Sequence, residues 1–275
     1  MPNFRTWTDL AYGSAGSLTL ALDLHLPDPR PTGPLPVIVH VHGGAWLRGD
    51  KAMSPEVIAP FAEAGYAIAS IRYRLSHEAI FPAQIHDCKA AVRWARAHAE
   101  EYGLDADHIG AWGGSAGGHL VALLGTSGGV AELEGEGGHP GYSSRVQAVC
   151  DWFGPSDFRR MNDLPGAQDH DAPNSPESRL IGAPIQERPD LVARANPITY
   201  ITGAEPPFLI MHGTQDRTVL PNQSQMLYDA LRRAGAKATL VWLEGAGHGG
   251  PQFHTPQTTA QMIAFFDKHP KSQEG

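Results

Sequence analysis

The sequence is poor in charged residues and in cysteine. Only 18% of its residues are Asp, Glu, Lys or Arg, and 29 acidic against 21 basic residues give a formal net charge of −8. No segment is rich in Lys and Arg, so a nucleic acid would meet net repulsion and we expect no such partner. The two cysteines, Cys88 and Cys150, fall in helix-like and strand-like segments, which is typical of buried apolar residues in a reducing compartment rather than of a disulfide framework.

Long hydrophobic runs are also missing. No apolar stretch approaches the length of a membrane span, and the first ten residues, MPNFRTWTDL, lack the basic flank and apolar core of a secretory signal. We therefore expect no membrane partner and a cytoplasmic location, unless a leader precedes this sequence.

The chain has the length and the apolar content of one large globular domain. It has 275 residues, 41% of them hydrophobic, and we predict a single domain over residues 1–275. Short apolar runs bounded by Gly and Pro predict about eight strands, which later alternate with helical patterns. The predicted strands are 7–11, 18–26, 37–41, 67–73, 109–112, 146–153, 208–211 and 239–243. The predicted helices are 55–64, 82–102, 116–124, 221–234 and 255–268.

The alternation of strands and helices predicts an α/β fold. We expect a mostly parallel eight-stranded sheet with helices on both faces, and an antiparallel hairpin formed by the first two strands at one edge. Residues 154–207 break the alternation after the strand at 146–153. Because ligands bind at the carboxyl ends of strands in such sheets, we predict that residues 154–207 form a small cap over the active site.

The most informative motif is the segment IGAWGGSAGGHL, residues 109–120. Gly113, Ser115 and Gly117 form a GxSxG pattern between a strand-like and a helix-like run. This pattern is typical of a nucleophile elbow, in which a serine sits on a sharp strand-to-helix turn and small neighbours let the strand and the helix approach each other. The pattern alone is weak in a glycine-rich chain, so it must be supported by a base and an orienting group.

Both partners of a nucleophilic serine follow later in the chain. Asp216 comes after the strand FLIMH, and His248 comes after the strand ATLVWL, each in a loop at a strand end. We predict that Ser115, Asp216 and His248 form a catalytic triad. Asp151 and Asp157 also lie near a strand end on the same side, so another carboxylate could orient His248 instead of Asp216.

A candidate oxyanion hole follows the strand at 37–41. The sequence HGGAW, residues 42–46, opens a loop in which backbone N–H groups can approach a developing alkoxide, and the N–H of Ala116 can complete the hole. We expect His42 to brace this loop through hydrogen bonds and His119 to be a packed structural group. The run Asp169–His170–Asp171 is interpreted as a solvated part of the cap, and no metal site is predicted.

Together, GxSxG, HGGAW, Asp216 and His248 resemble the α/β-hydrolase superfamily over nearly the whole chain. HGGAW with GGSAGG is similar to the group that contains hormone-sensitive-lipase-like carboxylesterases and bacterial acetyl xylan and feruloyl esterases. Ala45 and Gly114 depart from the HGGG and GDSAGG of hormone-sensitive-lipase-like members, which favours the acetyl and feruloyl esterase branch. This resemblance implies an α/β-hydrolase fold and oxyanion donors at Gly44, Ala45 and Ala116.

The resemblance implies a serine carboxylesterase that acts on short-chain acyl esters of small molecules without a cofactor. Two related groups remain as alternatives, because HGGxW also resembles arylformamidases and residues 212–249 resemble the catalytic part of prolyl-oligopeptidase-like peptidases. A catalytically silent binding module of the same fold is the alternative outside enzymes. An exposed edge strand could also support a homodimer. We expect four aromatic side chains to contact the substrate: Trp46, Tyr73, Trp152 and Phe153.

Overall fold

An eight-stranded sheet runs through the protein in the computed structural model, which describes residues 3–166 and 168–269. The other residues of the predicted domain, 1–2, 167 and 270–275, lie outside this described part. The sheet order is β1-β2-β4-β3-β5-β6-β7-β8. Its strands are β1 (Phe4–Ala15), β2 (Leu18–Pro27), β3 (Leu35–Val41), β4 (Ala67–Ile71), β5 (Leu104–Gly114), β6 (Ala148–Trp152), β7 (Phe208–Gly213) and β8 (Ala238–Leu243).

The pairing of the strands confirms the predicted architecture. β1 and β2 form an antiparallel hairpin at one edge, and β2 pairs with β4 antiparallel. All pairs from β3 to β8 are parallel. The carboxyl ends of the parallel strands therefore meet at one rim, which is where the three predicted triad residues leave the sheet.

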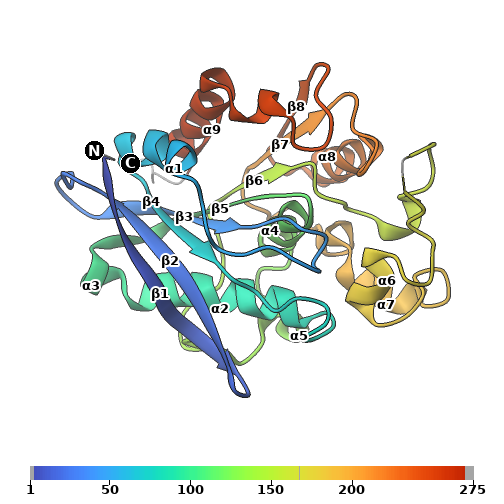
Figure 1. The fold of residues 1–275 in the computed structure, drawn as a ribbon, viewed down its shortest axis with the longest axis horizontal. Coiled ribbons are helices and arrows are strands. Elements are labelled where there is room, and N and C mark those ends of the chain that lie inside the picture. The colour runs from blue at the N-terminus through green and yellow to red at the C-terminus, as the bar shows by residue number, and fades with distance from the viewer. Residues whose placement is uncertain (1–2, 167, 270–275) are drawn as a thin grey trace.

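Helices cover both faces of the sheet, as predicted (Figure 1). Helices α1 (Pro55–Glu63) and α9 (Pro256–Lys268) lie on one face, where they pack around Trp112. Helices α2 (Ala83–Ala97), α4 (Ala116–Thr126) and α8 (Asn222–Ala234) lie on the other face. The short helices are α3 (Ala99–Tyr102), α5 (Ala131–Glu134), α6 (Pro176–Ile181) and α7 (Pro189–Ala195), and the 3-10 turns are η1 (Phe158–Arg160), η2 (Pro197–Tyr200) and η3 (Pro251–His254). Within the described residues, no helix is both long and apolar enough to cross a bilayer.

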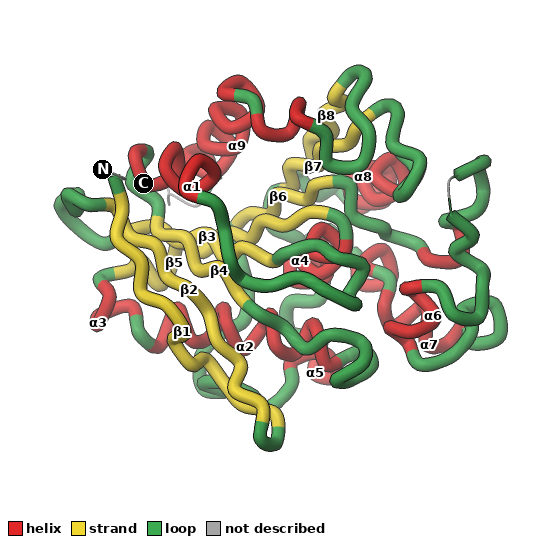
Figure 2. Tube along the Cα trace, in the orientation of Figure 1, coloured by secondary structure: helices red, strands yellow, loops and turns green. Residues whose placement is uncertain are grey.

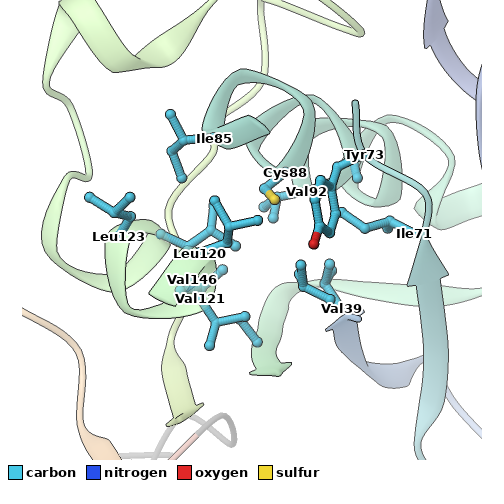
Figure 3. Close-up of a cluster of buried hydrophobic side chains, with 14 of the residues drawn as sticks. Val39, Ile71, Tyr73, Ile85, Cys88, Val92, Leu120, Val121, Leu123 and Val146 are labelled. Carbon is cyan, nitrogen blue, oxygen red and sulfur yellow. The ribbon is translucent and has the colours of Figure 1, made fainter. Parts of the chain in front are cut away.

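Side-chain alternation along β5 divides the core between the two faces. Ile109 and Ala111 are buried on the α2 and α4 side, whereas Trp112 is buried on the α1 and α9 side. Because successive strand residues point to opposite faces, one strand supplies both layers. Figure 3 shows part of the first layer, in which aliphatic side chains of α2 and α4 gather with Val39, Ile71 and Tyr73.

Residues 154–207 consist mainly of loops and short helices beside α4 (Figure 2). The segment is joined to α4 by a hydrogen bond of 2.7 Å between His119 Nε2 and the carbonyl oxygen of Ala195. His119 is fully buried, as expected for a packed structural group, and its ring lies 5.0 Å from that of Phe158. The segment therefore covers the α4 side of the rim.

Candidate active site

Ser115 occupies a strained turn between β5 and α4. Its φ of 56° and ψ of −122° lie in a region that residues with a side chain rarely adopt. The turn is held by the Ser115 N–H, which donates to the carbonyl oxygen of Trp152 at 2.9 Å. A Cβ at Gly113 would lie 2.6 Å from the backbone of Gly117, and a Cβ at Gly117 would overlap the carbonyl oxygen of Val41. Both glycines of the motif are thus required by backbone contact.

The structure brings the three predicted triad residues together. Ser115 Oγ lies 2.9 Å from His248 Nε2, and His248 Nδ1 lies 2.7 Å from Asp216 Oδ2. Because the Asp216 carboxylate can only accept a hydrogen bond, the proton of the neutral imidazole lies on Nδ1. Nε2 therefore carries the lone pair and accepts the hydrogen bond of the Ser115 hydroxyl. The side chain of Asp216 is fully buried, while that of His248 is 23% exposed and faces the rim.

The carboxylate of Asp216 has hydrogen-bond partners besides His248. Its Oδ1 accepts the backbone N–H groups of Thr218, at 2.8 Å, and Val219, at 3.1 Å. Its Oδ2 also lies 3.2 Å from Nε2 of His212, a fully buried histidine on β7. Burial alone would raise the pKa of Asp216, but the hydrogen bonds from His212 and His248 bring it to about 2. His212 is a functional residue that was not predicted, although it stands four residues before Asp216 in the sequence.

The other carboxylates proposed as orienting groups have different partners. Asp151 is fully buried and its Oδ1 accepts the N–H of Gly154 at 2.9 Å. Asp157 Oδ1 accepts the backbone N–H of Arg159 and the side-chain amide of Asn196. Of these carboxylates, Asp216 is the one bonded to His248.

The loop after β3 presents unpaired backbone donors beside Ser115. Gly44, Ala45 and Trp46 all have positive φ, of 115°, 56° and 57°. Within the described part of the chain, the N–H groups of Gly44, Ala45 and Ala116 have no backbone or side-chain acceptor, the last because it opens α4. A Cβ at Gly43 would lie 3.5 Å from Ser115 Cβ, so the loop runs directly against the nucleophile. This arrangement fits the predicted oxyanion hole.

His42 braces the loop, as expected. Its Nδ1 lies 2.7 Å from the carbonyl oxygen of Gly43, and its ring stacks on Tyr73 at 4.3 Å. Burial lowers the pKa of His42 and holds it neutral at neutral pH.

Ser115 and His248 open into a cavity of about 460 Å³. It is lined by Trp152 and Phe153, two of the four aromatic residues predicted to contact substrate. The remaining lining residues come from β3, the loop that joins β3 to α1, α1 itself, β5 and η3: His40, His42, Gly43, Gly44, Ala45, Arg48, Ala52, Met53, Ser54, Val57, Trp112, Gly114 and His254.

The expectation that Trp46 and Tyr73 contact the substrate is corrected, because neither lines this cavity. Trp46 is 2% exposed and packs edge-on against His119 and Phe158, since the positive φ values of Ala45 and Trp46 turn its side chain inward. Tyr73 is fully buried, and its hydroxyl donates to the carbonyl oxygen of His42 at 3.1 Å. Both residues therefore support the oxyanion loop from its buried side, away from the cavity.

The predicted cap also needs correction. No residue of 155–207 that the structure describes lines the cavity, because the segment packs on the α4 side and the cavity opens on the α1 side. Nor is His170 solvated. It is 4% exposed, with Nδ1 3.0 Å from Glu177 Oε1 and Nε2 2.9 Å from the carbonyl oxygen of Thr218. The segment thus supports the loop of Asp216 from outside. Among the described residues, no group of three or more His, Cys, Asp or Glu is arranged to hold a metal.

Comparison with known families identifies the chain at this point. A family model described as BD-FAE matches residues 22–231. The chain belongs to the BD-FAE family. This BD-FAE protein is 33% identical to esterase LipC of Mycobacterium tuberculosis over 89% of its length, and 34% identical to esterase LipQ of the same organism over 86%. It spans 61% of LipC and 55% of LipQ, less than two thirds of either relative.

Solved structures agree with this membership. The BD-FAE chain superimposes with a TM-score of 0.88 on a truncated carbohydrate esterase from gut microbiota, at 37% identity and 97% coverage of both chains. A propionate-bound esterase of Thermogutta terrifontis, Est2, gives a TM-score of 0.77 at 28% identity, with 97% of this chain and 94% of that chain covered. The family, the named relatives and these structures place the chain in the α/β-hydrolase superfamily, and the relatives and solved structures named here are described as esterases. The names favour the esterase interpretation over the arylformamidase and peptidase alternatives.

Proposed function

We propose that this protein is a serine carboxylesterase that hydrolyses short-chain acyl esters, such as acetyl or feruloyl esters of carbohydrates, through an acyl-enzyme. The observation that carries the proposal is the hydrogen-bonded line from Asp216 through His248 to Ser115, which ends in the cavity beside unpaired donors. Neighbouring structures described as a carbohydrate esterase, and as Est2 with propionate or butyrate bound, support a short acyl group and a carbohydrate alcohol.

Acylation uses the hydrogen bonds already present in the site. His248 Nε2 takes the proton of the Ser115 hydroxyl while Oγ bonds to the ester carbonyl carbon, and the carbonyl electrons move onto its oxygen. The N–H groups of Gly44, Ala45 and Ala116 donate to that oxygen. Asp216, whose pKa of about 2 keeps it ionised, stabilises the imidazolium.

Release of the alcohol and deacylation follow by the same groups. When the tetrahedral oxyanion collapses, the bond to the alcohol oxygen breaks and the proton on His248 Nε2 passes to that oxygen. A water molecule then gives a proton to Nε2 while its oxygen bonds to the acyl carbon. The bond between that carbon and Ser115 Oγ breaks, and the proton on Nε2 passes to Oγ. The product acid and the resting enzyme balance the reaction.

Ser115→Ala tests the proposal on p-nitrophenyl acetate. We expect kcat to fall by about 10⁶, because the nucleophile and the group that activates it act as a unit. Ser14→Ala, at an exposed serine of β1, is the matched control and should keep full turnover. Retention of more than a few per cent of activity by Ser115→Ala would exclude this serine as the nucleophile.

A fluorophosphonate separates the enzyme from a silent binding module. The unaltered protein and Ser14→Ala should be labelled covalently and Ser115→Ala should not, because labelling needs an activated hydroxyl. An Est2 structure described as phosphonylated by cyclosarin, which is a phosphonofluoridate, shows that such reagents react with a neighbour of this chain. An unlabelled wild-type protein would favour the binding module.

The acyl length is tested with acetate, butyrate and octanoate esters of one phenol. We expect kcat/KM to be highest for acetate or butyrate, since no residue of 155–207 that the structure describes adds an apolar lid to the cavity. A maximum at octanoate would refute the short-chain preference while leaving the esterase assignment intact.

A further inference from the structure

Arg48 is the only permanently charged side chain among the described residues that line the cavity. The lining set contains no Asp, Glu or Lys. His40 and His42 also line it, but burial lowers the pKa of His40 to about 3 and lowers that of His42, so neither carries charge at neutral pH. The protein as a whole is acidic, with a formal net charge of −8. The cavity therefore differs in charge from the molecule that surrounds it.

The guanidinium of Arg48 has no partner within the described part of the chain. Across residues 3–166 and 168–269, it makes no ion pair, and no hydrogen bond of its side chain is formed. Several other arginines are paired, such as Arg74 with Asp87 at 2.6 Å. The acidic residue nearest in sequence, Asp50, is exposed and its Oδ1 accepts the N–H of Ala52. An exposed arginine without a partner can still bind an incoming anion through two parallel hydrogen bonds.

The position of Arg48 is fixed relative to the oxyanion loop. Its backbone N–H donates to the carbonyl oxygen of Gly44 at 3.2 Å, and its Cγ would lie 3.2 Å from a Cβ at Gly44. The stem of the arginine thus lies against Gly44, whose N–H is one of the proposed oxyanion donors. Gly43, the residue before Gly44, lies against Ser115 in turn, so Arg48 and Ser115 contact consecutive residues of the same loop.

We propose that Arg48 is a specificity determinant that selects esters carrying a carboxylate, or another anionic group, near the scissile bond. The proposal rests on the esterase function proposed above. The anion binds the guanidinium in the cavity while the ester carbonyl lies at Ser115, and no Asp or Glu among the described lining residues supplies a competing counter-ion. Arg48 forms no bond with reacting atoms, so it acts through binding and appears mainly in KM and kcat/KM.

Matched ester pairs test this assignment. One pair, meta-acetoxybenzoate and its methyl ester, varies charge on the alcohol side. The other, p-nitrophenyl monoadipate and its methyl ester, varies charge on the acyl side. For at least one pair, Arg48→Ala should lower the ratio of kcat/KM on the anionic ester to that on the neutral ester about tenfold, with the loss in KM. Arg48→Lys should restore part of the ratio, and Arg48→Glu should lower it further.

Two controls make the result decisive. Arg233→Ala, at an exposed arginine of α8, changes the net charge equally and should leave both ratios unchanged. High salt should weaken the wild-type preference for the anionic ester, because a solvent-accessible ion pair is screened. An equal effect of Arg48→Ala on both members of both pairs, or the same ratios in Arg48→Ala and Arg233→Ala, overturns the proposal. Turnover of p-nitrophenyl acetate by the wild-type protein reports on the esterase function separately.

Discussion

Replacing Asp151 with asparagine should stabilise the protein at pH 8 and not at pH 4. Asp151 is fully buried at the end of β6, its Oδ1 accepts one N–H, and its Oδ2 has no partner among the described residues. Burial raises the pKa of Asp151 from 3.8 to about 7, and the hydrogen bond from Gly154 only partly opposes this. Ionising the carboxyl in the folded protein is therefore costly.

The magnitude follows from the two pKa values. Because the pKa of Asp151 is higher in the folded protein than in the unfolded chain, the protonated carboxyl contributes its full stability below about pH 4. This contribution is lost as the pH rises to about 7. Each pH unit in that window changes the free energy of unfolding by about 1.4 kcal/mol, or roughly 4 kcal/mol in all. The amide that replaces the carboxyl does not titrate, so the Asp151→Asn variant should gain up to this amount relative to wild type.

Urea unfolding from pH 4 to pH 8 measures the effect. The gap between Asp151→Asn and wild type should widen up to about pH 7 and then stay constant, whereas Asp229→Asn, exposed on α8, should show no such trend. A gap that does not change with pH would refute a buried, ionising carboxyl. The same variant should keep the proposed esterase activity, because Asp216 is the carboxylate that is bonded to His248.

Two further substitutions test how the site is supported. Gly117→Ala should lower kcat about 100-fold and destabilise the fold by about 3 kcal/mol, because the added Cβ overlaps the carbonyl oxygen of Val41. A Cβ added at Gly141 meets open space, so the control Gly141→Ala should change neither turnover nor melting temperature. His170→Gln should lower the free energy of unfolding by about 1–3 kcal/mol at pH 6 and by less at pH 9. Burial lowers the pKa of His170, but the neighbouring Glu177 raises it, and the pKa in the folded protein lies above 6.5. The ion pair of the wild-type protein therefore stabilises it fully below pH 6.5, and this stability is lost as the pH rises through the folded-state pKa. Equal costs at both pH values, measured by urea unfolding, would contradict this ion pair.

The sequence predicts best where chemistry is local. Ser115 could be recognised because an elbow demands small residues on either side, and the contacts of Gly113 and Gly117 meet that demand. Asp216 and His248 could be placed because each follows a strand, and parallel strands end at one rim. The parallel pairing from β3 to β8 agrees with the predicted alternation of strands and helices.

The walls of the cavity were harder to predict because they depend on turns and on packing between distant segments. Trp46 was assigned to the rim from its place after HGGA, but the three successive positive φ values of Gly44, Ala45 and Trp46 turn it into the core. His254 enters through a 3-10 turn that no periodic pattern marks. Trp112 could have been found, because it lies two residues before Gly114 and alternate residues of a strand share a face.

His248 lies in the loop that follows an edge strand of the sheet. β8 is last in the sheet order and bonded to β7 alone, and none of its six residues is buried. Local opening of such an edge needs less free energy than melting of the central strands. On gentle warming the protein should lose the proposed esterase turnover while its circular dichroism spectrum stays native. Cooling should restore turnover at once, without the lag of refolding.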